Sequence, residues 1–131
     1  MSKNILALLA SALLLAIAGI GIASAVDPPP PPTMLRARVS ADGTMVKGTT
    51  GASSDRLNTG DYWVRFNNHN VAGCIYQATL SAKKSIVTPD DPGSITVQPR
   101  YTNTKEVLVS TFAPGGGEGD HGFDLVVFCW S

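Results

Sequence analysis

The fold class of this chain is determined by the stretch Asn58-Thr59-Gly60-Asp61-Tyr62-Trp63-Val64-Arg65-Phe66. Its first four residues are turn-forming types, and the remaining five are typical of a strand. Side chains at every second position of a strand share a face. The face predicted to point to the core carries Tyr62, Val64 and Phe66. The opposite face carries Trp63 and Arg65, so the stretch predicts a turn followed by a half-buried β-strand.

The same kind of pattern recurs from residue 34 onward. Short runs of β-branched and aromatic residues are separated by Gly, Asn, Asp and Pro. The predicted strand segments are Arg36–Val39, Tyr62–Phe66, Val71–Leu80, the run around Ile95 and Val97, Lys105–Phe112 and Phe123–Trp130. No segment after residue 25 has a helical period over ten residues. The pattern predicts an all-β domain, an antiparallel β-sandwich or jelly roll of about eight short strands.

Two turn signals separate these predicted strands. Asp42-Gly43 is the dipeptide that favours a type I′ hairpin turn. The segment Pro89–Gly93 predicts a turn before the strand around Ile95. Both signals favour antiparallel neighbours.

The last predicted strand is apolar on both faces. One face carries Phe123, Leu125, Val127 and Cys129; the other carries Val126, Phe128 and Trp130. A strand of this kind is typical of the middle of a sandwich or of a subunit contact.

The N-terminal 25 residues have the layout of a secretory signal peptide. Lys3 is the only charge before an apolar run from Ile5 to Ile22, and small residues follow it up to Ala25. We expect a signal helix over residues 1–25, cleavage after Ala25, and a secreted or extracytoplasmic protein. Because the run is also long enough to span a bilayer, the alternative is an uncleaved N-terminal membrane anchor.

A proline-rich linker follows, and residues 26–33 are assigned to it. Its five prolines, Pro28–Pro32, favour an extended polyproline II helix of roughly 15 Å. The β-sandwich domain is predicted to occupy residues 34–131.

The only two cysteines, Cys74 and Cys129, both lie in this domain. In an oxidising compartment an even count predicts a disulfide. The alternative is a pair of buried free thiols that pack as small hydrophobic groups. Neither cysteine has a second Cys or a His at metal-ligand spacing.

The charge balance argues against nucleic acid as a partner. Removing Lys3 from ten basic residues leaves nine against ten acidic residues, without a run of like charges. This composition lacks the electrostatic signature of nucleic-acid or anionic-membrane binding. A membrane is expected as a partner only if the N-terminal segment is retained.

Catalytic motifs are scarce, and we expect no enzyme activity, cofactor or metal. The glycine-rich run Gly115–Gly119 lacks the Lys-Ser/Thr pair of a phosphate-binding loop. His121 has carboxylates nearby, but their spacing matches no calcium loop. The first alternative is a small secreted hydrolase that uses a carboxylate pair. The candidate pairs are Glu118 with Asp124 and Asp61 with Asp55. A secreted inhibitor or effector is the second alternative.

Trp63 and Arg65 form the candidate binding site. An exposed indole beside a guanidinium suits a glycan or a protein partner. The alternative is that Trp63 packs in a second layer or a subunit contact. We therefore expect an exported, non-enzymatic recognition or structural module at the cell surface or outside it, with a glycan or a cell-surface protein as its partner.

Several segments together resemble a group of small, uncharacterised secreted bacterial β-domains. The resemblance covers nearly all of residues 35–131 and rests on a Gly-X-Tyr-X-Val-X-Phe strand and a Cys-X-Tyr motif. The matching segments are Ala37–Val39, Asp42–Thr44, Gly60–Phe66, Gly73–Thr79 and Phe123–Cys129. It implies an all-β fold and a Cys74–Cys129 pair, but no activity. More distantly, the layout is similar to fibre-tip knob domains, which implies a trimer as one possible oligomeric state.

Overall fold

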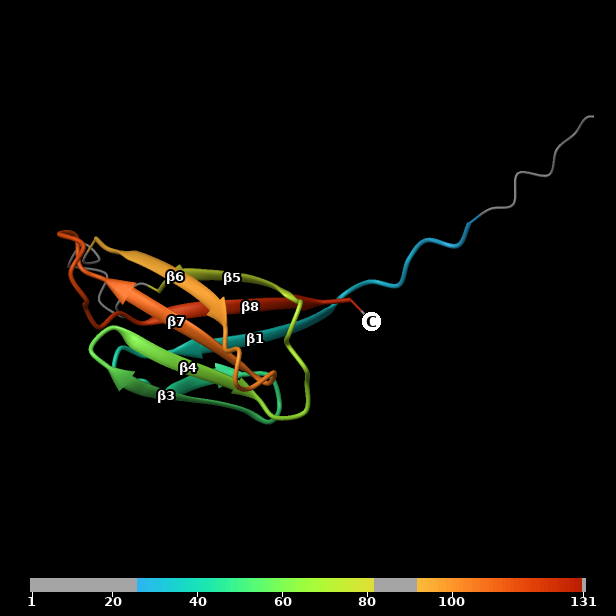
Figure 1. Ribbon diagram of the computed structural model, residues 1–131, viewed down its shortest axis with the longest axis horizontal. Coiled ribbons are helices and arrows are strands. Elements are labelled where there is room, and N and C mark those ends of the chain that lie inside the picture. The colour runs from blue at the N-terminus through green and yellow to red at the C-terminus, as the bar shows by residue number, and fades with distance from the viewer. Residues whose placement is uncertain (1–25, 82–91, 131) are drawn as a thin grey trace, which may run out of the picture.

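The computed structural model describes residues 26–81 and 92–130, and these form a β-sandwich of two four-stranded antiparallel sheets (Figure 1). The strands are β1 (Thr33–Val39), β2 (Met45–Gly48), β3 (Ala52–Asn58), β4 (Asp61–Phe66), β5 (Ile75–Leu80), β6 (Ser94–Pro99), β7 (Glu106–Phe112) and β8 (Phe123–Cys129). The predicted all-β class and the antiparallel sandwich are confirmed. The predicted signal helix lies outside the described residues.

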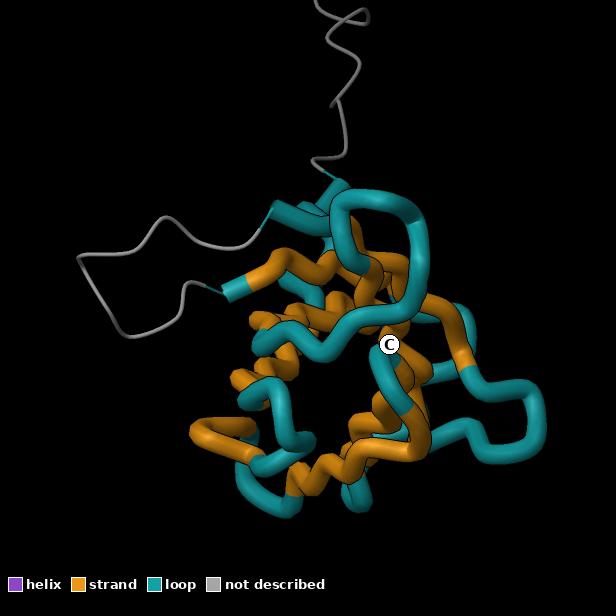
Figure 2. The backbone as a smooth tube through the Cα atoms, turned by 90° about the vertical axis from the view of Figure 1, so that its left-hand side faces the viewer, coloured by secondary structure: helices purple, strands orange, loops and turns teal. Residues whose placement is uncertain are grey.

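The chain alternates between the two sheets. The first sheet has the strand order β2-β1-β8-β5, and the second has the order β3-β4-β7-β6. Thus β1 and β8 are the central strands of one sheet, and β4 and β7 are the central strands of the other. In Figure 2 the strands of the two sheets surround a common centre.

The core comes from the inner faces of these central strands. Tyr62, Val64 and Phe66 are each at most 1% exposed, so the predicted core face of β4 is confirmed. The Tyr62 ring meets the ring of Phe123 on β8 edge-on, with centroids 5.2 Å apart. The other members of the buried cluster are Leu35, Ala37, Val39, Val71, Val107, Val109, Leu125 and Val127. All described strands, and the buried cluster between them, lie between Thr33 and Cys129.

The predicted hairpin between β1 and β2 is present, but its turn is not type I′. A type I′ turn needs positive φ at both central residues, whereas Gly43 (φ 90°) is the only residue of this turn with positive φ. The Gly43 amide donates to the Ser40 carbonyl, and the Ser40 amide donates to the Thr44 carbonyl. This is a longer loop with glycine in the left-handed position.

The strand predicted from Val71 begins later, at Ile75. The side chain of Asn70 accepts a hydrogen bond from the Ala72 amide, and Gly73 has φ of 77°. This local turn competes with strand pairing, and it places Val71 in the core, where it is fully buried.

Cys74 and Cys129 form a disulfide, as predicted. The bond joins the residue before β5 to the last residue of β8, next to the pair Ile75–Phe128. It therefore closes one end of the first sheet rather than linking the two sheets. Both cysteines are half-buried and pack against the core.

The segment before β1 contains the five prolines. Residues 26–32 belong to no strand, and they lead away from the domain at the end where β8 finishes (Figure 1). The described part of the chain contains no helix that is long and apolar enough to cross a membrane. Most of the predicted Pro89–Gly93 turn lies outside the described residues.

Candidate functional site

Trp63 and Arg65 lie on the outer face of the second sheet, opposite the core face of β4. The strand register fixes the neighbours of Trp63: Asp55 of β3 on one side and Leu108 of β7 on the other. Gln98 of β6 follows next to Leu108. We call this line of four side chains across the sheet the Trp63 row. Its two outer members, Asp55 and Gln98, are exposed, and its two inner members are half-buried.

Arg65 is stacked on Trp63. The guanidinium carbon lies 4.9 Å from the centroid of the indole ring. A cation in this position is attracted to the ring quadrupole, by about 0.5–1 kcal/mol at an exposed site. The two predicted site residues therefore form one unit and do not act as independent side chains.

The position of Arg65 is set by Glu106, a residue that the sequence pattern did not single out. Glu106 lies directly opposite Arg65 on β7 and is 1% exposed. Its Oε1 accepts hydrogen bonds from Nε of Arg65, at 2.7 Å, and from Nη2. Its Oε2 accepts a hydrogen bond from Nη1 of Arg100. Each oxygen of the buried carboxylate thus has a guanidinium partner.

These two arginines keep Glu106 ionised. Burial alone would raise the pKa of Glu106, because it disfavours the charged form. The hydrogen bonds and positive charges of Arg65 and Arg100 outweigh burial, and they lower the pKa below its ordinary value. A buried charge of this kind is costly to leave unpaired, so it constrains the rotamer of Arg65.

The outer face retains hydrogen-bonding capacity for a ligand. Arg65 is still 39% exposed at its side chain, and its Nη1 donates no hydrogen bond to any residue in the described ranges. Asp55 and Gln98 lie exposed on either side of the indole. Donors, acceptors and an aromatic surface are therefore placed together on this sheet face.

The structure separates one predicted carboxylate pair and places the other pair on one sheet face. Asp124 pairs with Arg38 on the first sheet, at 2.7 Å, whereas Glu118 bridges to Phe112 at the end of β7 in the second sheet. Asp55 of β3 and Asp61 of β4 both lie on the outer face, and the register of the two strands shifts between them, at Arg56–Asn58. Asp61 accepts a hydrogen bond of 2.6 Å from Ser110.

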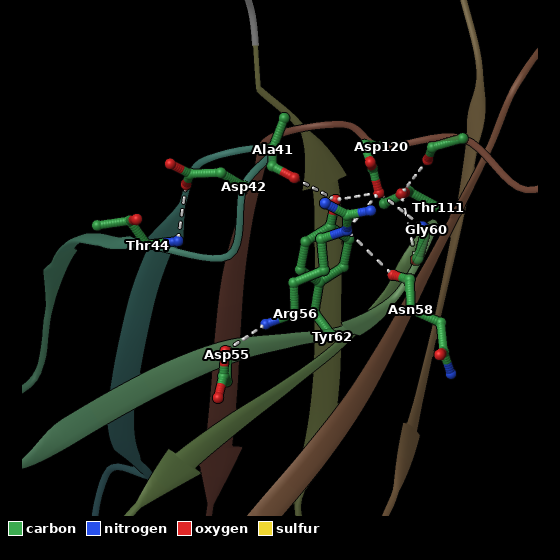
Figure 3. A network of polar contacts seen from close by, with 11 residues as sticks. Ala41, Asp42, Thr44, Asp55, Arg56, Asn58, Gly60, Tyr62, Thr111 and Asp120 are labelled. Carbon is green, nitrogen blue, oxygen red and sulfur yellow. Dashed lines mark hydrogen bonds and ion pairs between the residues drawn. The ribbon is translucent and has the colours of Figure 1, made fainter.

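A second polar cluster lies at the far end of the sandwich from the linker (Figure 3). Asp120 accepts hydrogen bonds from the Gly60 amide at 2.7 Å and from the Tyr62 hydroxyl at 3.2 Å, and it pairs with Arg56 at 3.1 Å. The Tyr62 hydroxyl also lies 2.8 Å from the Ala41 carbonyl and can donate to it. Burial first, and then the charge of Asp120, raise the pKa of Tyr62 to about 12. This cluster ties three loops together, and its carboxylate is occupied by structural contacts.

Metal-ligating side chains do not gather in the described part of the chain. No group of three His, Cys, Asp or Glu side chains there is placed to hold an ion. His121 lies beside Gly93, and Asp124 is engaged by Arg38.

No family model, curated protein or solved structure matches this chain significantly. The resemblance to secreted bacterial β-domains therefore stays a prediction. The structure itself shows a small β-sandwich. It has a disulfide at one end of the first sheet and a stacked Trp63–Arg65 unit on the outer face of the second.

Proposed function

We propose that this protein is an exported, non-enzymatic recognition module that binds a glycan on the Trp63 row. The observation that carries the proposal is the stacked Trp63–Arg65 unit, which buried Glu106 holds in place on the outer face of the second sheet. A ligand then meets side chains that are already ordered, which reduces the entropy lost on binding.

The chemistry of the row fits a sugar ring. The half-exposed indole offers an apolar surface for ring C–H groups, and a carboxylate and an amide flank it to bind hydroxyls. Arg65 covers one side of the indole, so the sugar would pack against the part that remains exposed. Nη1 of Arg65 would donate to a ring or hydroxyl oxygen at that position.

The Cys74–Cys129 disulfide fits a protein that is exported from the cytoplasm. Structural disulfides persist in oxidising compartments outside the cytoplasm, where glycans of cell walls and surfaces are found. We place the mature protein there, with residues 1–25 as its export signal and the proline-rich segment as a spacer.

The test is a glycan array probed with residues 26–131, followed by calorimetric titration of the ligands that bind. Trp63→Ala is expected to weaken binding at least tenfold, because it removes both the stacking surface and the support for Arg65. The matched control is Ile75→Ala, an exposed apolar residue of the first sheet, which should bind as the native protein does. Glycan binding that survives Trp63→Ala would exclude the row as the site, and a silent array would contradict a glycan ligand.

The position of Asp55 and Asp61 on the same outer sheet face favours a second candidate, a glycan hydrolase that uses these carboxylates. It predicts that the bound glycan is cleaved and that Asp61→Asn abolishes cleavage while binding remains. Chromatography of the array ligand after long incubation with the native protein distinguishes the two. An intact ligand supports the binding module.

A further inference from the structure

The outer face of the first sheet carries a row of apolar side chains. Phe128 of β8 lies directly between Met34 of β1 and Ile75 of β5. Met34 is 46% exposed and Ile75 is 59% exposed. Val126, two residues before Phe128, extends the row along β8. We call these four residues the apolar row.

Trp130 adds to this surface at the end of β8. It directly follows Cys129 and is 56% exposed. The corresponding face of the second sheet has a polar or charged residue at most outer positions. An apolar outer face on a central strand, next to an exposed tryptophan, is typical of a surface that contacts something else.

Three basic residues lie beside the apolar row. Arg36 and Arg38 occupy the next two outer positions of β1, and Lys47 is directly opposite Arg38 on β2. They line a hollow of about 540 Å³ together with Met34, Val126 and Asp124. Asp124 is engaged by Arg38 through two hydrogen bonds. Within residues 26–81 and 92–130, Arg36 and Lys47 form no ion pair with a carboxylate.

The apolar end of the outer face of the first sheet lies next to the proline-rich linker. Thr33, the first residue of β1, pairs with Cys129, so the chain enters the domain at the end where Met34, Phe128 and Trp130 lie. Figure 1 shows residues 26–32 leaving from this end. The stiff proline-rich segment thus connects directly to the apolar end of the face.

We propose that the outer face of the first sheet docks on an anionic phospholipid bilayer. Apolar side chains would enter the headgroup region, where tryptophan is favoured. Arg36 and Lys47 would pair with lipid phosphates, because basic residues near an anionic surface are attracted to it. A second copy of the chain fits less well, since pairing this face with itself would bring the positive charges of the two copies together. In the docked state the Trp63 row, on the opposite sheet, faces away from the membrane.

The experiment is flotation of residues 26–131 with vesicles of phosphatidylcholine containing one-third phosphatidylglycerol, compared with pure phosphatidylcholine. We expect binding to the anionic vesicles and at least tenfold weaker binding to neutral ones. The double variant Arg36→Gln/Lys47→Gln should lose about 25-fold in affinity, since each charge contributes about fivefold. Trp130→Gln should lose about tenfold on the anionic vesicles.

A matched control uses the second sheet. Leu57 is 46% exposed, the same as Met34, so Leu57→Gln and Met34→Gln are compared directly, and only the latter should weaken vesicle binding. Circular dichroism and thiol labelling verify that every variant is folded with its disulfide intact. Equal binding to neutral and anionic vesicles, or no binding to either, would overturn the proposal. Concentration-dependent dimerisation that Met34→Gln abolishes, without vesicle binding, would instead assign the face to a second copy and also overturn it.

Discussion

Arg65 and Glu106 face each other across β4 and β7, and Nε of the arginine donates to Oε1 of the glutamate at 2.7 Å. One partner is fully buried and the other is 39% exposed at its side chain. Glu106 is thus a buried carboxylate on the outer face of the second sheet, beside the partly exposed Arg65. Because the same guanidinium is stacked on Trp63, the buried carboxylate determines how the indole is presented.

Glu106 should make stability depend on pH in the acid range. Its pKa is lowered in the folded protein, so the ionised form stabilises the fold at pH values above the unfolded pKa of about 4.3. That contribution is lost as the pH falls through the folded pKa. Urea unfolding should show that Glu106→Gln costs about 1–3 kcal/mol at pH 7 and clearly less at pH 3. A stability difference that does not change between these pH values would contradict the assigned ionisation.

Trp63 and Tyr62 are adjacent in sequence but lie on opposite faces, and truncating them should give different results. Tyr62→Ala should cost about 3–5 kcal/mol, because a fully buried ring leaves a cavity. Trp63→Ala should cost about 1–2 kcal/mol, from the half-buried indole and its contact with Arg65. The free energy of unfolding of both variants is measured by urea titration. Equal losses would mean that Trp63 is a core residue.

The disulfide should contribute a large part of the stability. The bond closes a loop across a sequence separation of 55 residues, and removing such a bond from a small domain costs about 2–5 kcal/mol. The double variant Cys74→Ala/Cys129→Ala should unfold at correspondingly lower urea. Maleimide labelling of the native protein should detect no thiol. Two reactive thiols would show that the cysteines are free.

The Tyr62 hydroxyl should stabilise the end of the sandwich that is far from the linker. Tyr62→Phe removes its contacts with the Ala41 carbonyl and with Asp120. Because the Ala41 carbonyl and the carboxylate lose a partner at a partly buried position, we expect a loss of about 1–3 kcal/mol. Hydrogen exchange at the Gly43 and Gly60 amides should become faster. Unchanged exchange would mean that the loops are held by other contacts.

The local pattern was sufficient to predict the strands that have one apolar face. The alternation in β4 identified its three core residues, and the double-sided apolar pattern of β8 matches its central position. By contrast, β3 shows no alternation of apolar and polar residues. It is an edge strand of mostly small and polar residues, and its strand conformation is stabilised by hydrogen bonds to its neighbour more than by burial of its own side chains. Its identity depends on pairing with β4.

Features that depend on strand register could not be predicted from the sequence. The burial of Glu106 follows from its position opposite Arg65, which is 41 residues away.

The balanced overall composition also concealed a local excess of positive charge on the first sheet. Pairing β1 with β2 gathers Arg36, Arg38 and Lys47 on one face, while β8 supplies only Asp124 to compensate them.

The central claim is that the Trp63 row binds a glycan. The measurement that tests it most directly is calorimetric titration of the strongest array ligand into the native residues 26–131, Trp63→Ala and Ile75→Ala. The account predicts that the native protein and Ile75→Ala bind with the same affinity, and that Trp63→Ala binds at least tenfold more weakly. Equal affinity for all three proteins would contradict it.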